Sequence, residues 1–402
     1  MGAASCQSFH ARHRAGPHFR DDPAATGPHA ARRRGLFRAG LIAAVLALAG
    51  AVAGADTLRV ASYNTELSRR GPGLLLGAIL GGKDEQVAAV VQVIAAARPD
   101  ILVLQGVDYD AEGRALAALA DRLGRAGLAY PHRFALAPNR GVRTGLDLDG
   151  DGRLGGPGDA QGFGYFTGQE GMAILSRFPI RADAVRDLSG LIWADMPGAV
   201  LPMRAGRPFP TAAAQAVQRL STTGHWDVPV QVGATVLHLL AYHATPPVFD
   251  GPEDRNGLRN RDELRLWLRY LEGALPGPPP PRDRFVLLGD ANLDPVDGDG
   301  HGAAMRALLA DPRLTDPAPR SAGGRAAAWQ GGANAAHRGD PALDIADWDD
   351  DGPGNLRVDY VLPSADLAVV GAGVLWPDGG PLAETVAVAS RHRLVWVDIA
   401  LP

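Results

Sequence analysis

Carboxylate, amide and imidazole side chains recur in this sequence at the points where apolar runs end. The clearest case is the run from Phe285 to Leu288, which is followed by Gly289, Asp290 and Asn292. The run predicts a short buried strand that Gly289 ends, and alternate residues of an extended chain point to the same side. Asp290 and Asn292 can therefore face one pocket, where the carboxylate orients a water and the amide donates to an anionic oxygen. The same two residues would also serve as ordinary turn residues.

Five further polar residues follow or precede predicted strands in the same way: Asn64, Glu170, His243, Asp359 and His392. A carboxylate can hold a divalent cation, and a histidine paired with a carboxylate has its tautomer and basicity set by that partner. Amides and imidazoles can stabilise charge on phosphoryl oxygens. The set therefore suits hydrolysis of a phosphate ester, although each residue taken alone also fits a surface role.

Apolar periodicity predicts the elements that position these residues. Strands are predicted at 57–63, 101–104, 171–176, in a hairpin within 228–242, at 285–288, at 356–362 and at 394–399. Helices are predicted at 84–97, 111–127 and 260–273, and the segments 250–259 and 294–353 are predicted to be loops. Strands and helices alternate at the start of the chain, and long loops separate the later elements.

Composition sets limits on the class of protein. The 402 residues, 46% hydrophobic and 21% charged, are typical of a globular protein with one large domain or two smaller ones. The formal net charge of -4 provides no overall basic field, which weakens a nuclease function without excluding it. Cys6 is the only cysteine, so an intrachain disulfide is impossible.

The N-terminal region has the pattern of a targeting segment. Residues 1–31 show no apolar period, which predicts a disordered extension. Three arginines at 32–34 precede an uncharged apolar run that ends in the small residues 53–55, which predicts a signal peptide cleaved between Ala55 and Asp56. We therefore expect an exported protein, periplasmic or extracellular, whose functional domain is 56–402 and which keeps no stable membrane span. Retention of the run as an uncleaved anchor is the alternative.

An acidic loop resembles the start of a calcium-binding loop. Asp147, Asp149 and Asp151 alternate with other residues, and a glycine stands at the sixth position. The twelfth position, where a bidentate glutamate is usual, is Gly158, and Asp159 follows it. Either a calcium site, completed by Asp159, or a solvated acidic loop is consistent with this pattern.

Six segments in order carry a resemblance to a known family. They are RVASYN at 59–64, PDILVLQ at 99–105, GMAILSR at 171–177, GDAN at 289–292, RVDY at 357–360 and SRH at 390–392. Together they resemble the motif series of the endonuclease/exonuclease/phosphatase superfamily, in an exported bacterial-type member. The resemblance covers 57–402 and implies the deoxyribonuclease I-like α/β fold. This is a four-layered α/β sandwich in which two mostly antiparallel sheets pack face to face with helices outside.

The resemblance also implies roles for the polar residues. Asp290 would orient or deprotonate the attacking water, and Asn292 would hold the scissile phosphate. Asp359 would hydrogen-bond His392, which would contact the phosphate and stabilise the transition state. Asn64 would lie beside the metal and the phosphate.

By the same resemblance, His243 matches a strand-end histidine of the secreted nucleases in the superfamily. Glu170 matches the carboxylate that is paired with that histidine. A Glu170–His243 pair is therefore expected beside the Asp359–His392 pair.

Two positions depart from the family pattern. The usual metal-binding glutamate follows the glutamine of a Leu-Gln-Glu motif, but Gly106 follows Gln105 here. We expect Glu66 to hold the cation instead, with Asp108 and Asp110 as alternatives. Arg391 stands where relatives usually have aspartate before the last histidine, and this cation can bind phosphate but not a metal.

The sequence thus predicts an exported, metal-dependent phosphoesterase that uses Mg²⁺, or alternatively Mn²⁺ or Ca²⁺, and acts as a monomer. Its substrate stays open between DNA, a phosphomonoester, an inositol phosphate and a phospholipid head group. Nucleic acid is a possible partner that the charge does not indicate, and the low charge favours a small substrate. The alternative function is a binding protein on the same fold that lost turnover together with the glutamate replaced by Gly106.

Overall fold

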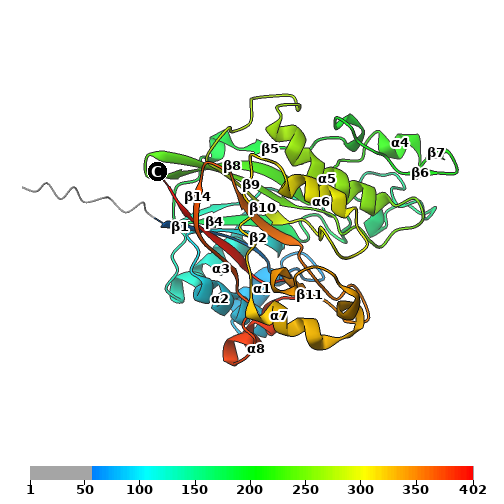
Figure 1. The fold of residues 1–402 in the computed structure, drawn as a ribbon. Coiled ribbons are helices and arrows are strands. Elements are labelled where there is room, and N and C mark those ends of the chain that lie inside the picture. Colours follow the sequence, from blue (N-terminus) through cyan, green and yellow to red (C-terminus); the bar gives the residue numbers. More distant parts are fainter. Residues whose placement is uncertain (1–56, 402) are drawn as a thin grey trace, which may run out of the picture. The chain divides into compact units, whose positions relative to one another are not determined.

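Two β-sheets lie at the centre of the computed structural model, which describes residues 57–401 (Figure 1). The first sheet has the strand order β14 (Ala368–Val374), β15 (Val395–Ala400), β1 (Thr57–Asn64), β2 (Ile101–Val107), β4 (Gly171–Ser176) and β3 (His132–Phe134). The second has the order β13 (Asp359–Pro363), β10 (Phe285–Asp290), β9 (Thr235–His243), β8 (Gly224–Val232) and β5 (Arg186–Asp187). Each sheet has one parallel pairing, β1 with β2 and β9 with β10, and its other pairings are antiparallel. The expectation of mostly antiparallel sheets is confirmed.

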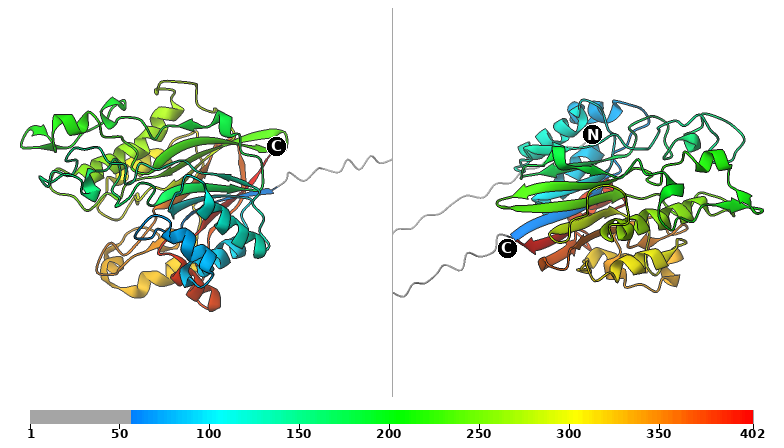
Figure 2. Two further views of the ribbon diagram at one scale, coloured as in Figure 1. Left: turned by 180° about the vertical axis from the view of Figure 1, so that it is seen from behind. Right: turned by 90° about the horizontal axis from the view of Figure 1, so that it is seen from above.

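Helices cover the outer face of each sheet (Figure 2). The first sheet is covered by α1 (Leu74–Gly81), α2 (Glu85–Ala97), α3 (Arg114–Arg125) and α8 (Pro381–Ala389). The second sheet is covered by α5 (Arg255–Leu271) and α6 (Gly302–Leu309). The arrangement is helices, sheet, sheet, helices, so the predicted four-layered α/β sandwich is confirmed.

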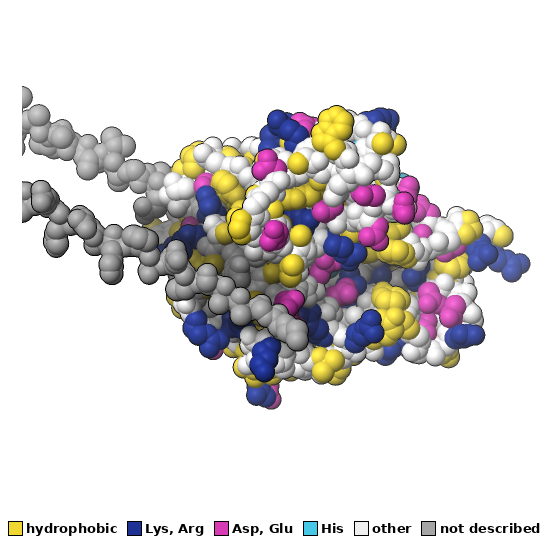
Figure 3. All heavy atoms as spheres, turned by 90° about the horizontal axis from the view of Figure 1, so that it is seen from below, with side chains coloured by type: hydrophobic (Ala, Val, Ile, Leu, Met, Phe, Trp, Pro, Cys, Tyr) yellow, Lys and Arg dark blue, Asp and Glu magenta, His cyan; other side chains and the backbone are white. Residues whose placement is uncertain are grey.

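Charged side chains are mixed on the face drawn in Figure 3, where neither acidic nor basic groups form a continuous patch. The predicted N-terminal extension, the signal peptide and its cleavage position all fall within 1–56, outside the described residues. Among residues 57–401, no helix combines the length and apolarity needed to cross a membrane.

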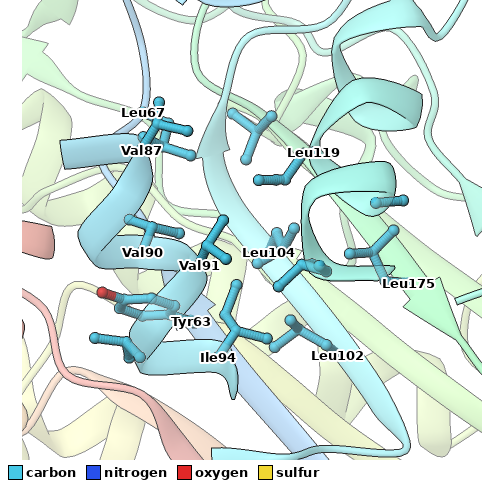
Figure 4. Close-up of a cluster of buried hydrophobic side chains, with 14 of the residues drawn as sticks. Tyr63, Leu67, Val87, Val90, Val91, Ile94, Leu102, Leu104, Leu119 and Leu175 are labelled. Carbon is cyan, nitrogen blue, oxygen red and sulfur yellow. The ribbon is translucent and has the colours of Figure 1, made fainter. Parts of the chain in front are cut away.

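Strand alternation explains why the core has three layers of apolar contacts. In β10, Val286 and Leu288 point into the contact between the two sheets, whereas Phe285 and Leu287 pack toward the helices. On the other side, residues of β1 and β2 meet the apolar face of α2 and its neighbours, as Figure 4 shows. Burial of each such side chain contributes roughly 1.5–3 kcal/mol, so the strand ends rest on a rigid frame.

The elements differ from the prediction where polar contacts override periodicity. The strand predicted at 356–362 is split into β12 (Asn355–Leu356) and β13, because the backbone N–H of Arg357 donates to the Asp294 carboxylate. Helix α5 begins at Arg255, inside a segment predicted to be a loop. The predicted loop 294–353 contains α6 and α7 (Ala322–Ala327).

Short elements complete the described chain. The remaining helix and strands are α4 (Ala212–Gln215), β6 (Met203–Arg204), β7 (Arg207–Pro208) and β11 (Ala346–Asp347). Single 3₁₀ turns lie at Pro157–Asp159, Ala182–Ala184, Trp193–Asp195, Ala328–Gln330, Gly332–Ala336 and Pro341–Leu343. None of these turns lines the cavity described next.

Candidate active site

Strand register in the second sheet places three polar residues side by side on adjacent strands. Asp290 is the last residue of β10, and it pairs with His243 at the end of β9. On its other side, Asp290 pairs with Asp359 at the start of β13. Because neighbouring strands lie about 4.8 Å apart, the three side chains are placed beside one another by the backbone alone.

The first sheet contributes two more residues to the same place. Asn64 ends β1, and its Nδ2 donates to Asp290 Oδ2 at 2.9 Å. His392 lies just before β15, and its Nε2 is 3.5 Å from Asn64 Nδ2 and 4.0 Å from Asp290 Oδ2. The site therefore spans both sheets, and contact between the sheets assembles it.

A cavity of about 630 Å³ opens over these strand ends. Six of the seven predicted polar residues line it: Asn64, Glu170, His243, Asp290, Asn292 and His392. The seventh, Asp359, lies behind the cavity and is bonded to His392, with Oδ2 at 2.7 Å from Nδ1. The structure thus gathers the predicted set at one site, with the expected Asp359–His392 pair formed.

Backbone geometry at the end of β10 explains how Asp290 and Asn292 come together. Gly289 lies inside the strand, which continues to Asp290, so the prediction that Gly289 ends it is wrong. A Cβ at Gly289 would lie 1.9 Å from the carbonyl oxygen of Tyr242, which makes glycine necessary for the close strand contact. Asn292 follows with a φ of 48°, and its backbone N–H donates to Asp290 Oδ1 at 2.8 Å. A left-handed turn, and not strand alternation, therefore directs Asn292 toward the cavity.

The carboxamide of Asn292 is oriented by two contacts. Its Nδ2 donates to the carbonyl of Ala244 at 3.0 Å and to Asp290 Oδ2 at 3.2 Å. Together with Asn64, it gives the Asp290 carboxylate a set of fixed donors. Such donors orient the carboxylate toward the cavity without neutralising it.

Burial and neighbouring charges give the acid–base groups different protonation states. Burial raises the pKa of Asp290, and the nearby Asp359 carboxylate raises it further. Burial lowers the pKa of His392, but the carboxylates of Asp359 and Asp290 outweigh this effect and raise it to about 9. Burial, with the positive charges of Arg140 and His392, holds the pKa of His243 well below its usual range. At neutral pH, His392 is an imidazolium and His243 a neutral imidazole.

The expected Glu170–His243 pair is not formed, and that prediction is wrong. Glu170 Oε2 is instead 2.7 Å from Arg140 Nη1. His243 Nε2 lies 3.4 Å from Asp290 Oδ2, while its buried Nδ1 has no hydrogen-bond partner among the described residues. Arg140 attracts Glu170 because a buried guanidinium requires a carboxylate partner.

Arg140 is the site residue that sequence reasoning missed. It lies in an irregular loop, lines the cavity, and is held by a bond of 3.0 Å from its Nε to Thr223 Oγ1. No apolar period or motif surrounds it in the sequence, so only the folded chain reveals it. Trp348 adds an apolar wall, and its ring meets the His392 ring edge-on at 5.4 Å.

The residues expected to bind a divalent cation are engaged in other contacts. Asp108 accepts bonds from Ser68 Oγ at 2.7 Å and from the backbone N–H of Arg69 at 2.8 Å and of Glu170 at 3.1 Å. Asn64 Oδ1 accepts the N–H of Glu66 at 3.2 Å. Asp110 is equally occupied, because its two carboxylate oxygens accept N–H groups at the start of α3. These side chains shape turns and do not form an open cation site.

Another group of possible ligands lies deeper. Ligand atoms of Asp290, Asp359 and His392 are within 4.8 Å of one another. The atoms that face each other in Asp359 and His392 are joined by a hydrogen bond, and Asp359 is fully buried. The other Asp359 oxygen, Oδ1, is buried without a hydrogen-bond partner among the described residues. The Asp359–His392 hydrogen bond makes this cluster an acid–base pair beside Asp290.

The predicted calcium loop brings three carboxylates together on the surface. Oxygen atoms of Asp147, Asp149 and Asp151 lie within 4.8 Å of one another. Asp159, the candidate for the missing ligand, is buried and accepts the N–H groups of Leu148 at 3.0 Å and of Gly156 at 2.9 Å. Asp159 therefore closes the loop as a structural acceptor and does not complete a ligand set.

Comparison with known sequences identifies one family. The sequence profile described as "Endonuclease/Exonuclease/phosphatase family" matches residues 61–396. No curated protein sequence matches the chain.

Solved structures with a similar fold include three bacterial proteins. An endonuclease/exonuclease/phosphatase from Beutenbergia cavernae is 20% identical with a TM-score of 0.47, covering 86% of this chain and 72% of its own. Sphingomyelinase C from Streptomyces griseocarneus is 20% identical with a TM-score of 0.45, and the match covers 85% of this chain and 99% of the sphingomyelinase chain. Beta toxin from Staphylococcus aureus, a mutant with bound magnesium ions, is 10% identical with a TM-score of 0.43, and the match covers 85% of this chain and 99% of the toxin chain. These likenesses concern the fold and not the substrate.

Proposed function

The chain belongs to the endonuclease/exonuclease/phosphatase family, and from this premise we propose that it hydrolyses a phosphate ester by attack of water. The observation that carries the proposal is the position of Asp290, between a neutral His243 and a charged His392 at the floor of one cavity. A carboxylate of raised pKa beside an imidazolium is an acid–base arrangement suited to hydrolysis near neutral pH.

In the proposed reaction, Asp290 accepts a proton from the attacking water as the water oxygen forms a bond to phosphorus. The bond from phosphorus to the ester oxygen breaks, and the leaving oxygen takes up a proton from solvent. His392, held by Asp359, donates from Nε2 to a phosphoryl oxygen, where an imidazolium stabilises the developing charge. Asn292 and Asn64 keep the Asp290 carboxylate oriented throughout.

Hydrolysis of model substrates tests this proposal. Wild type is assayed on bis-p-nitrophenyl phosphate, p-nitrophenyl phosphate and plasmid DNA, with Mg²⁺, Mn²⁺ or Ca²⁺ and with EDTA. We expect Asp290→Asn and His392→Asn to lower the rate on the preferred substrate by roughly 10²–10⁴-fold, since each removes a proton-transferring or charge-stabilising group.

His238 offers a matched control for the histidine substitution. It also pairs with an aspartate, with Nδ1 at 2.6 Å from Asp227 Oδ1, but it lies five residues before His243 in β9 and does not line the cavity. His238→Asn should leave the rate within about twofold of wild type, because it touches no cavity residue. Equal losses in His238→Asn and His392→Asn would point to damage of the fold and would remove the support for this site.

A binding protein without turnover is the second candidate, and it is favoured because Gly106 stands where the family pattern has its metal-binding glutamate. Wild-type rates no faster than those of Asp290→Asn on every substrate would establish this alternative. Thermal melting with inorganic phosphate would then detect phosphate binding, because a ligand that binds only the folded state raises the melting midpoint.

We propose further that the protein is exported. The support is the basic and apolar pattern of 32–55, which lies outside the described residues. N-terminal sequencing of protein recovered from the periplasm or medium should give Asp56 as the first residue. Recovery of the full-length chain from the membrane fraction would favour the uncleaved anchor instead.

A further inference from the structure

Glu66, the first choice for a cation ligand, is fully engaged by its neighbours. Its Oε1 accepts a bond of 2.8 Å from Arg391 Nε and a second from Nη2 of the same guanidinium. Its Oε2 accepts the backbone N–H of Arg391 at 2.8 Å and Ser390 Oγ at 3.1 Å. Both oxygens are therefore bound, and a cation could reach them only by displacing Arg391.

The neighbouring position cannot supply a replacement carboxylate. Gly106 has a φ of 70°, and a Cβ there would lie 2.5 Å from Asn64 Oδ1 and 2.8 Å from the backbone nitrogen of Glu66. Any side chain at this position must push away the end of β1. The local backbone therefore leaves no space for a glutamate at position 106.

Arg391 presents its charge to the cavity while Glu66 holds it. The side chain is 62% exposed and lines the same cavity as Asp290 and His392. Its Nη1 donates to no residue of 57–401, which leaves the N–H groups of Nη1 available to a ligand. A guanidinium is permanently charged and can hold phosphate oxygens through two parallel hydrogen bonds.

A second guanidinium of the same cavity is held in the same way. Arg140 is buried, and Glu170 pairs with it as Glu66 pairs with Arg391. Two arginine–glutamate pairs thus border the Asp290 site, and each glutamate fixes a positive charge where an anionic ester would bind.

We propose that the Arg391 guanidinium, fixed by Glu66, takes the place of the divalent cation, so that this cavity binds phosphate esters by arginine and without metal. The catalytic half of this inference rests on the proposed phosphoesterase function. Arg391 and a cation compete for one carboxylate, so replacing Arg391 by an aspartate should open a cation site that wild type lacks.

Binding of Mn²⁺ alone to EDTA-treated protein tests the inference without an activity assay. All proteins in the calorimetric titration carry Asp149→Asn, which removes one carboxylate of the surface loop and so its Mn²⁺ binding. The series compares the full chain, called wild type here, with Glu66→Gln, Arg391→Asp and Arg391→Asp/Glu66→Gln. We expect wild type and Glu66→Gln to give the same titration. Arg391→Asp should gain one Mn²⁺, and adding Glu66→Gln should weaken that binding at least tenfold. Wild-type Mn²⁺ binding that Glu66→Gln weakens at least tenfold would overturn the inference.

Phosphate binding gives a second readout, independent of folding of the aspartate variant. Inorganic phosphate is titrated into wild type, Arg391→Lys and Arg391→Gln in EDTA. Phosphate affinity should be highest for wild type, lower for Arg391→Lys and lowest for Arg391→Gln, since lysine keeps the charge but not the paired donors. Identical affinities in all three would overturn the role of Arg391.

Activity then separates this inference from the proposed function. Hydrolysis in EDTA should equal hydrolysis with Mg²⁺ within about twofold, whereas a metal-dependent site should lose more than about 100-fold. A loss of that size on chelation would overturn the inference and leave the phosphoesterase proposal standing. No hydrolysis under any condition would instead end the phosphoesterase proposal, while the Mn²⁺ and phosphate titrations would still decide the inference.

Discussion

At the scale of single residues, His392 carries a charge that its surroundings maintain. Asp359 and Asp290 outweigh burial and raise its pKa to about 9, from 6.5 in an unfolded chain. A group whose pKa is raised on folding contributes stability that is complete below its unfolded pKa and is lost as pH rises through the folded value. The contribution is therefore lost between pH 7 and about 10.

We predict that wild type loses roughly 3 kcal/mol of unfolding free energy between pH 7 and 10 through this group, measured by urea denaturation. His392→Asn should show a flatter pH dependence over that window, because it has no imidazolium to lose. The rate of ester hydrolysis should fall in parallel above pH 9. Matching slopes in the two proteins would show that the charge of His392 is not maintained by Asp359.

Gly106 provides the second prediction at this scale. Gly106→Ala should destabilise the fold by about 1–3 kcal/mol, because a Cβ meets Asn64 in a left-handed backbone conformation. Gly113 is the matched control, with a φ of 65° and no atom within 4 Å of the place that a Cβ would take. Urea midpoints that fall equally in Gly106→Ala and Gly113→Ala would mean that backbone strain alone accounts for the loss.

The side-chain pairs show how far residue-level prediction reaches. The Asp359–His392 pair was predicted correctly, because both partners belong to recognisable segments at strand ends. The Glu170 partner was predicted wrongly, because the competing Arg140 comes from a loop without periodicity. A carboxylate pairs with the nearest buried cation in the fold, and proximity across a loop cannot be read from spacing.

At the scale of elements, strands were easier to predict than the turns between them. The runs around β1, β2, β4, β9, β10 and β15 are apolar enough that burial decides their conformation, and each was predicted within a few residues. Contacts to single polar groups decide the rest, as where Asp294 binds the N–H of Arg357 and divides a predicted strand. Such contacts join residues far apart in sequence, so periodicity does not reveal them.

The loop at 147–151 carries the prediction that belongs to this scale. Its three carboxylates converge without a bidentate partner, which suits the weak calcium affinity of roughly 10⁻⁴–10⁻³ M known for extracellular modules. At about ten times that dissociation constant, Ca²⁺ should stabilise the fold by roughly 1.4 kcal/mol. Thermal melting with Ca²⁺ and with EGTA measures the shift.

Two substitutions identify the origin of any calcium effect. Asp149→Asn should abolish the shift, since it removes one converging carboxylate. Asp351→Asn, in another exposed acidic loop, should leave it unchanged. An equal midpoint in Ca²⁺ and EGTA for wild type would show that the loop is a solvated acidic turn.

At the scale of the whole molecule, the net charge that the chain would have after the proposed export bears on the substrate. Residues 1–55 contain seven arginines and two aspartates, so removal of this segment would change the formal net charge from -4 to -9. Charges are also mixed on the face shown in Figure 3, with no continuous basic patch. A net negative charge of this size would repel a polyanion at long range, whereas the two arginines of the cavity would attract a small anionic ester.

We therefore predict that a chain lacking residues 1–55 hydrolyses bis-p-nitrophenyl phosphate faster than it nicks plasmid DNA at equal phosphate concentration. Between 50 and 200 mM NaCl, kcat/KM for the small ester should change by less than about tenfold, because one or two arginine–phosphate contacts release few ions. A protein that binds DNA through six to ten phosphate contacts would lose roughly 10³–10⁵-fold in affinity over the same range. Rapid plasmid cleavage with such a steep salt dependence would contradict the small-ester assignment and place the basic contacts outside the cavity.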